Sequence, residues 1–108
     1  MTYETAVRAW EEISESKQAV LKEQLVRAAV AYARVRTDWQ LVSRQERLEM
    51  DSRRTALHDV FIDACNILSR TMTKAGEGAE WRKRLGDDRK AIGDLACWIH
   101  CFLGLAAR

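Results

Sequence analysis

The chain has 108 residues, a length typical of one domain, and this excludes an enzyme built from separate cofactor and substrate domains. Hydrophobic residues make up 47% and charged residues 31%, with no proline and only five glycines. This composition excludes a disordered or collagen-like chain and disfavours the many turns of an all-β fold. The formal net charge of +2 does not by itself indicate nucleic-acid binding, which requires clustered cations. We therefore expect one all-α domain over residues 1–108.

Periodic apolar residues predict two helices in the first half of the chain. Thr2 can cap a first helix that ends near residues 14–17. The next apolar set repeats at alternating steps of four and three residues, which is the strongest periodic signal in the sequence. Its members are Leu21, Leu25, Ala28, Tyr32, Val35, Trp39 and Val42. Ser43 and Glu46 then have the spacing of a capping box, which predicts the start of a third helix.

The second half of the chain predicts one long helix, one short helix and one final helix. The third helix is expected to run to about Lys74, where Gly76 and Gly78 supply a stop. Residues 79–85 can form at most two turns, and Asp87 offers a cap for the final helix. We expect a helical bundle of four main helices plus a short helical turn. The expected common core comprises Leu25, Tyr32, Trp39, Leu57, Phe61, Leu68, Ile92, Ile99 and Phe102.

The final helix is apolar on nearly all sides. One face carries Ile92, Leu95, Ala96, Ile99, Phe102, Leu103 and Ala106, and much of the other carries Cys97, Trp98, Cys101, Gly104 and Leu105. Such a helix must be covered on both sides, so we expect a homodimer whose interface is this second set of residues. The alternative is a helix at the centre of the monomer. The longest nearly uncharged run has 13 residues, short of the roughly 20 that cross a bilayer, so no membrane span is expected.

The cysteines and the start of the chain predict a cytoplasmic, reduced protein. The three cysteines lie inside apolar helical patterns, and the opening Met-Thr-Tyr-Glu-Thr does not resemble a signal peptide. Cys97, His100 and Cys101 share one side of a helix and are residue types that bind zinc. Tetrahedral zinc needs a fourth ligand, and small buried cysteines also pack as ordinary core residues. We expect no metal and no cofactor.

Two groups of polar residues are candidates for a binding site. Asp59, Asp63 and Asn66 fall along one stripe of the third helix. Carboxylates at this spacing repel unless a cation lies between them, so the stripe is either a solvated face relieved by arginines of a neighbouring helix or a site for a divalent metal or a basic partner. Asp87 and Asp88 precede the final helix, where anions favour the helix dipole.

The segment Ile-Gly-Asp-Leu at residues 92–95 resembles the second motif of the all-α nucleoside triphosphate pyrophosphohydrolases, and Glu12-x-x-Glu15 resembles the first. The resemblance implies a helical oligomer in which these carboxylates bind magnesium. The second glutamate of that family would fall at Ala91. The residues themselves favour an ion pair of Asp94 with an arginine.

Arg53-x4-His58 is similar to the arginine and histidine motif of HEPN-type ribonucleases, which are small dimeric helical bundles. The resemblance implies that His58 acts as general acid or base and that Arg53 stabilises the phosphate. Arg54 stands where that family usually has a polar uncharged or acidic residue.

The sequence favours a small cytoplasmic interaction or regulatory protein that self-associates through its C-terminal helix. It leaves open a further protein partner and whether the chain is an enzyme acting on nucleotides or RNA, with His58, Arg53 and Asp94 as catalytic candidates. A nucleic-acid-binding module, using arginines and the Trp81-Arg82-Lys83-Arg84 segment, is less favoured because acidic residues interrupt the cations. An enzyme predicts that its polar candidates converge in one pocket.

Overall fold

The computed structural model describes residues 1–107, and within them the chain forms helices and no strand. The helices are α1 (Tyr3–Glu15), α2 (Ala19–Leu41), α3 (Arg44–Lys74), α4 (Glu80–Leu85) and α5 (Arg89–Ala106). The predicted all-α fold, with four main helices and one short one, is therefore confirmed.

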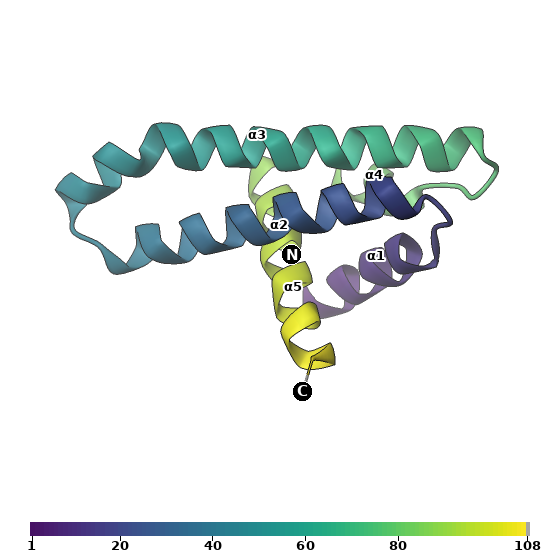
Figure 1. Ribbon diagram of the computed structural model, residues 1–108, viewed down its shortest axis with the longest axis horizontal. Helices are drawn as coiled ribbons and strands as arrows, with labels where there is room; N and C mark the ends of the chain where they lie inside the picture. The colour runs from purple at the N-terminus through teal and green to yellow at the C-terminus, as the bar shows by residue number, and fades with distance from the viewer. Residues whose placement is uncertain (108) are drawn as a thin grey trace.

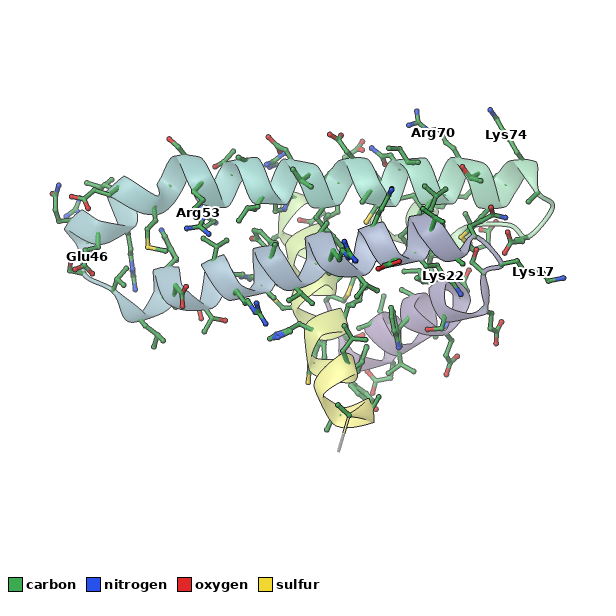
Figure 2. All side chains as sticks on the ribbon, in the orientation of Figure 1. Lys17, Lys22, Glu46, Arg53, Arg70 and Lys74 are labelled. Atoms are coloured by element: carbon green, nitrogen blue, oxygen red, sulfur yellow. The ribbon has the colours of Figure 1, made fainter. Side chains whose placement is uncertain are left out.

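An antiparallel hairpin of α2 and α3 forms the long axis of the molecule, and α5 crosses it (Figure 1). The helix α1 packs against α4 and α5 on one side of this crossing. The buried residues of α2 end at Val35 and those of α3 begin at His58. Residues 36–57 therefore form an arm without any buried side chain, which projects beyond α5 with Glu46 near its tip (Figure 2).

Side chains fix the starts of three helices. The Thr2 hydroxyl accepts from the backbone N–H of Thr5 at 3.2 Å, and Ser43 and Glu46 form the predicted capping box. The predicted cap of the final helix is wrong by one residue. Gly86 turns the chain at φ +59°, and it is the Asp88 carboxylate that accepts from the first backbone N–H groups of α5. Asp87 is exposed in the turn before it.

The core contains most of the residues expected from the periodic pattern. Leu25, Tyr32, Phe61, Leu68, Ile92 and Ile99 are buried, and Trp81 of α4 is completely buried with them. Leu57 is partly buried and packs against this core. Trp39 and Phe102 are also only partly buried and lie outside it, so the prediction is wrong for these two. Trp39 lies on the arm, where the guanidinium groups of Arg47 and Arg54 cover its ring at 4.6 and 4.7 Å from the centroid. On the arm, two cations rather than the side chains of another helix therefore cover the Trp39 ring.

Gly93 allows α5 to lie close against α2. A Cβ atom at this position would stand 2.9 Å from the Tyr32 hydroxyl oxygen and 3.1 Å from a carbon of its ring. The Tyr32 ring in turn packs edge-on against the His58 imidazole, with 5.0 Å between ring centroids. One residue from each of α2, α3 and α5 therefore meets at the crossing.

Replacement of Phe61 tests the assignment of the core. Phe61 has no exposed surface, whereas its neighbour Val60 is 53% exposed. We expect Phe61→Ala to lower the free energy of unfolding by about 3–5 kcal/mol, because a buried ring is lost and a cavity remains. Val60→Ala should change it by less than about 0.5 kcal/mol. Equal losses for the two variants in urea denaturation would contradict the packing described here.

Candidate functional site

An exposed aromatic cluster lies where α1 meets α5. The Tyr3 ring packs edge-on against Trp98 and Phe102, with centroid distances of 5.7 and 6.2 Å, and the Trp98 and Phe102 rings stack at 5.8 Å. Beside them is a shallow, mainly apolar pocket of about 240 Å³, which Glu11 also lines. We call the whole surface the aromatic face, and it comprises Tyr3, Val7, Trp10, Trp98, Phe102 and Leu105.

The five interface candidates of α5 have two different environments. Cys97 is half-buried beside Arg36, and Trp98 is half-buried under the aromatic contacts with α1. Cys101, Gly104 and Leu105 are exposed on the last turns. The monomer thus covers the second apolar side of α5 over its first half and leaves it open near its end.

Asp94 forms the polar centre of the contact between α2 and α5. Its carboxylate accepts from the Arg36 guanidinium at 2.9 Å and from the α-ammonium group of Met1 at 3.1 Å. Burial alone would raise the pKa of Asp94, but hydrogen bonds from these two cations outweigh it and hold the pKa below its usual range. Arg36 also donates to the Cys97 sulfur at 3.7 Å. Burial raises the pKa of the Cys97 thiol and that of Cys65, the latter to about 12.

The polar stripe of α3 is bound by arginines from two other helices. Arg89 of α5 pairs with Asp59 at 3.0 Å, and Arg82 of α4 donates to the Asn66 side-chain oxygen at 2.8 Å. Asp63 is exposed between them. Arginines of neighbouring helices, which we expected to offset the charge of this stripe, therefore contact two of its three residues.

The carboxylates suggested by the pyrophosphohydrolase resemblance do not form a cluster. Glu12 pairs with Arg84 and accepts from the Trp81 backbone N–H, whereas Asp94 is held by Arg36. Over residues 1–107 no three histidine, cysteine, aspartate or glutamate side chains are placed to hold a metal ion.

The two residues of the ribonuclease-like motif are also separated. His58 is buried at the crossing of the helices, and it lines a pocket there. Arg53 lies exposed on the arm and does not line that pocket (Figure 2). Its neighbour Arg54 lines the pocket instead.

The pocket around His58 brings together basic residues that the sequence reasoning did not group with one another. Arg36 of α2, Arg54 of α3, and Arg89 and Lys90 of α5 all line it. These cations come from three segments that are far apart in the sequence, so no single local spacing predicts that they meet. The one available signal was the adjacent Arg89 and Lys90 immediately after the cap of α5.

Comparison of the chain with protein family models, with curated proteins and with solved structures gives no match in any of the three. The two family resemblances of the sequence thus rest on their short motifs alone. No helix in the described part of the chain combines the length and the apolar character needed to span a membrane.

Acid titration tests the contacts of Asp94. Because its pKa is lowered in the fold, the stability it contributes is complete above the unfolded-chain pKa of about 3.9 and is lost as the pH falls through the folded-state value. We expect Asp94→Asn to lower the melting temperature at neutral pH. The difference from the wild type should shrink below about pH 4 as the carboxyl group is protonated.

The exposed Asp87 provides the matched control for this titration. Asp87→Asn should leave both the melting temperature and its dependence on pH close to the wild type. If the melting temperatures of Asp94→Asn and the wild type differ by the same amount down to about pH 2 to 3, the proposed role of the Asp94 ion pairs is contradicted.

Proposed function

We propose that this chain is a small cytoplasmic interaction protein that works as a homodimer, joined through the aromatic face and the last turns of α5. The observation that carries the proposal is the exposure of large apolar side chains within one continuous cluster. Tyr3 is 56% exposed and Leu105 is 55% exposed, and both adjoin the half-buried rings of Trp98 and Phe102. Contiguous exposed apolar surface of this kind is typical of protein interfaces.

The shape of α5 favours a second copy of the chain as the partner. Its last turns project beyond the other helices (Figure 1), so the same turns of another copy can reach them. Cys101 and Gly104 are small and exposed there, and no atom lies within 4 Å of a Cβ built at Gly104. Small residues permit close approach of two helix backbones, and a twofold dimer is the commonest use of a self-complementary surface.

The arrangement of polar residues favours this proposal over an enzyme acting on nucleotides or RNA. Catalysis requires the acid, base and cationic groups to converge on one reacting atom. Here Arg53 and His58 do not share a pocket, and Glu12 and Asp94 belong to separate ion pairs. The free Cys65, Cys97 and Cys101 support a reducing, cytoplasmic location.

Light scattering coupled to size exclusion at micromolar concentration tests the proposal. We expect a dimer mass for the wild type and a monomer mass for Leu105→Glu and Cys101→Glu, because each places a charge in the centre of the apolar interface. Ile67→Glu is the matched control, since Ile67 is 43% exposed on α3 and away from the aromatic face. That variant should stay dimeric.

Two results would count against the proposed interface. A monomer mass for the wild type over the whole micromolar range contradicts self-association. A dimer that survives both Leu105→Glu and Cys101→Glu contradicts the location of the interface on α5. Far-UV circular dichroism of each variant confirms that a monomer mass arises from a folded chain.

A further inference from the structure

The pocket at the crossing of α2, α3 and α5 is lined mainly by basic side chains. Its volume is about 240 Å³, and it is lined by Tyr32, Arg36, Arg54, Thr55, His58, Arg89 and Lys90. Three arginines and one lysine, from three helices, therefore surround one small space, and no carboxylate is among the lining residues. The pocket lies at the first turn of α5, at the opposite end of that helix from the aromatic face.

Carboxylates outside the lining hold the three arginines in position. Arg36 pairs with Asp94 at 2.9 Å, Arg54 with Asp51 at 3.2 Å, and Arg89 with Asp59 at 3.0 Å. A guanidinium group has five N–H donors, so one such pair leaves donors for a further partner. Lys90 has no ion pair within residues 1–107. These contacts orient the arginines but also offset their charge, so Lys90 supplies the unpaired positive charge of the pocket.

His58 gives the pocket a buried polar group with incomplete bonding. The side chain is 6% exposed, and its Nε2 donates to the backbone carbonyl oxygen of Arg89 at 2.8 Å. The carbonyl oxygen can only accept, so Nε2 carries a proton. The Nδ1 atom is buried and has no partner, and the same holds for Nε of Arg54. Buried polar atoms without partners are uncommon and destabilise a fold.

We propose that this pocket binds the phosphate group of a small phosphate compound, either inorganic phosphate or a phosphate monoester such as a mononucleotide. Guanidinium groups match the geometry of phosphate oxygens through paired hydrogen bonds. A phosphate monoester carries a charge of about −2, which Lys90 and the remaining guanidinium donors attract. The pocket is smaller than the roughly 300–1,000 Å³ of sites for drug-sized ligands. It therefore has room for a phosphate group, with any attached group outside.

Side chains rather than backbone groups would make these contacts. The backbone N–H groups of Lys90 and Ala91, at the start of α5, already donate to the Asp88 carboxylate. An anion in the pocket therefore depends on Lys90 and on the arginines, while the unprotonated Nδ1 of His58 accepts from a hydroxyl group of the phosphate. This dependence makes the proposal testable by single substitutions.

Isothermal titration calorimetry with inorganic phosphate measures the predicted binding. Lys90→Gln removes an exposed cation without disturbing the core and should weaken the affinity by about tenfold or more, as expected for a lost charge-assisted hydrogen bond. His58→Gln keeps a donor for the Arg89 carbonyl and should weaken binding similarly. Because His58 is buried, the melting temperature of this variant shows whether it remains folded, and Lys90→Gln tests the pocket independently.

Arg34→Gln is the matched control for charge. Arg34 lies on α2, two residues before Arg36, but it is exposed and does not line the pocket. Its replacement should change the affinity by less than about twofold, because loss of a remote surface charge is screened. An equal loss for Arg34→Gln and Lys90→Gln would overturn the proposal, since it would show attraction by overall charge. Absence of binding to the wild type at millimolar phosphate would overturn it as well.

Titrations with adenosine monophosphate and with adenosine distinguish the sources of the phosphate. Binding of the nucleotide but not of the nucleoside supports recognition of the phosphate group. An affinity for the nucleotide equal to that for inorganic phosphate assigns the site to the phosphate alone, and a tighter affinity assigns it to a monoester. Binding of adenosine as tightly as the nucleotide would overturn the proposal.

Discussion

The close approach of α5 to α2 at Gly93 and Tyr32 is the constraint on which the rest of the structure depends. Gly93 has no Cβ, and the Tyr32 hydroxyl occupies the space that a Cβ would need. Protein interiors are densely packed, so even one added methyl group must move the two helices or the ring. Since α5 is a continuous helix from Arg89 to Ala106, this contact, together with the packing of α5 against α1 and α3, sets where both of its ends lie.

The residues next to this contact bind the two helices electrostatically as well. Asp94 directly follows Gly93, and its partner Arg36 lies one turn after Tyr32 on α2. Breaking this ion pair would leave a partly buried charge without its partner, so the pair favours the observed packing of α5 on α2. It also carries Arg36 to the rim of the basic pocket. The structural ion pair and the proposed anion site therefore share one side chain.

The helices and two of the three side-chain caps were predictable because their signals are local. The capping box of Ser43 and Glu46 and the stripe that buries Leu25 and Phe61 each depend on residues within a few turns. The prediction was wrong for Trp39, because its position in the periodic stripe does not reveal that the hairpin extends beyond every other helix. The basic pocket was not predicted at all. Its residues come from three helices, and only the angle at which α5 crosses the hairpin brings them together.

The stability of Gly93→Ala measures the central contact most directly, with Gly104→Ala as its control in the same helix. We predict that Gly93→Ala lowers the free energy of unfolding by about 1–3 kcal/mol, because the new methyl group meets the Tyr32 side chain. At a concentration where both variants are monomeric, Gly104→Ala should raise it by about 0.5–1 kcal/mol, because alanine favours a helix and nothing crowds that position. A Gly93→Ala variant as stable as the wild type would contradict the close crossing on which this account rests.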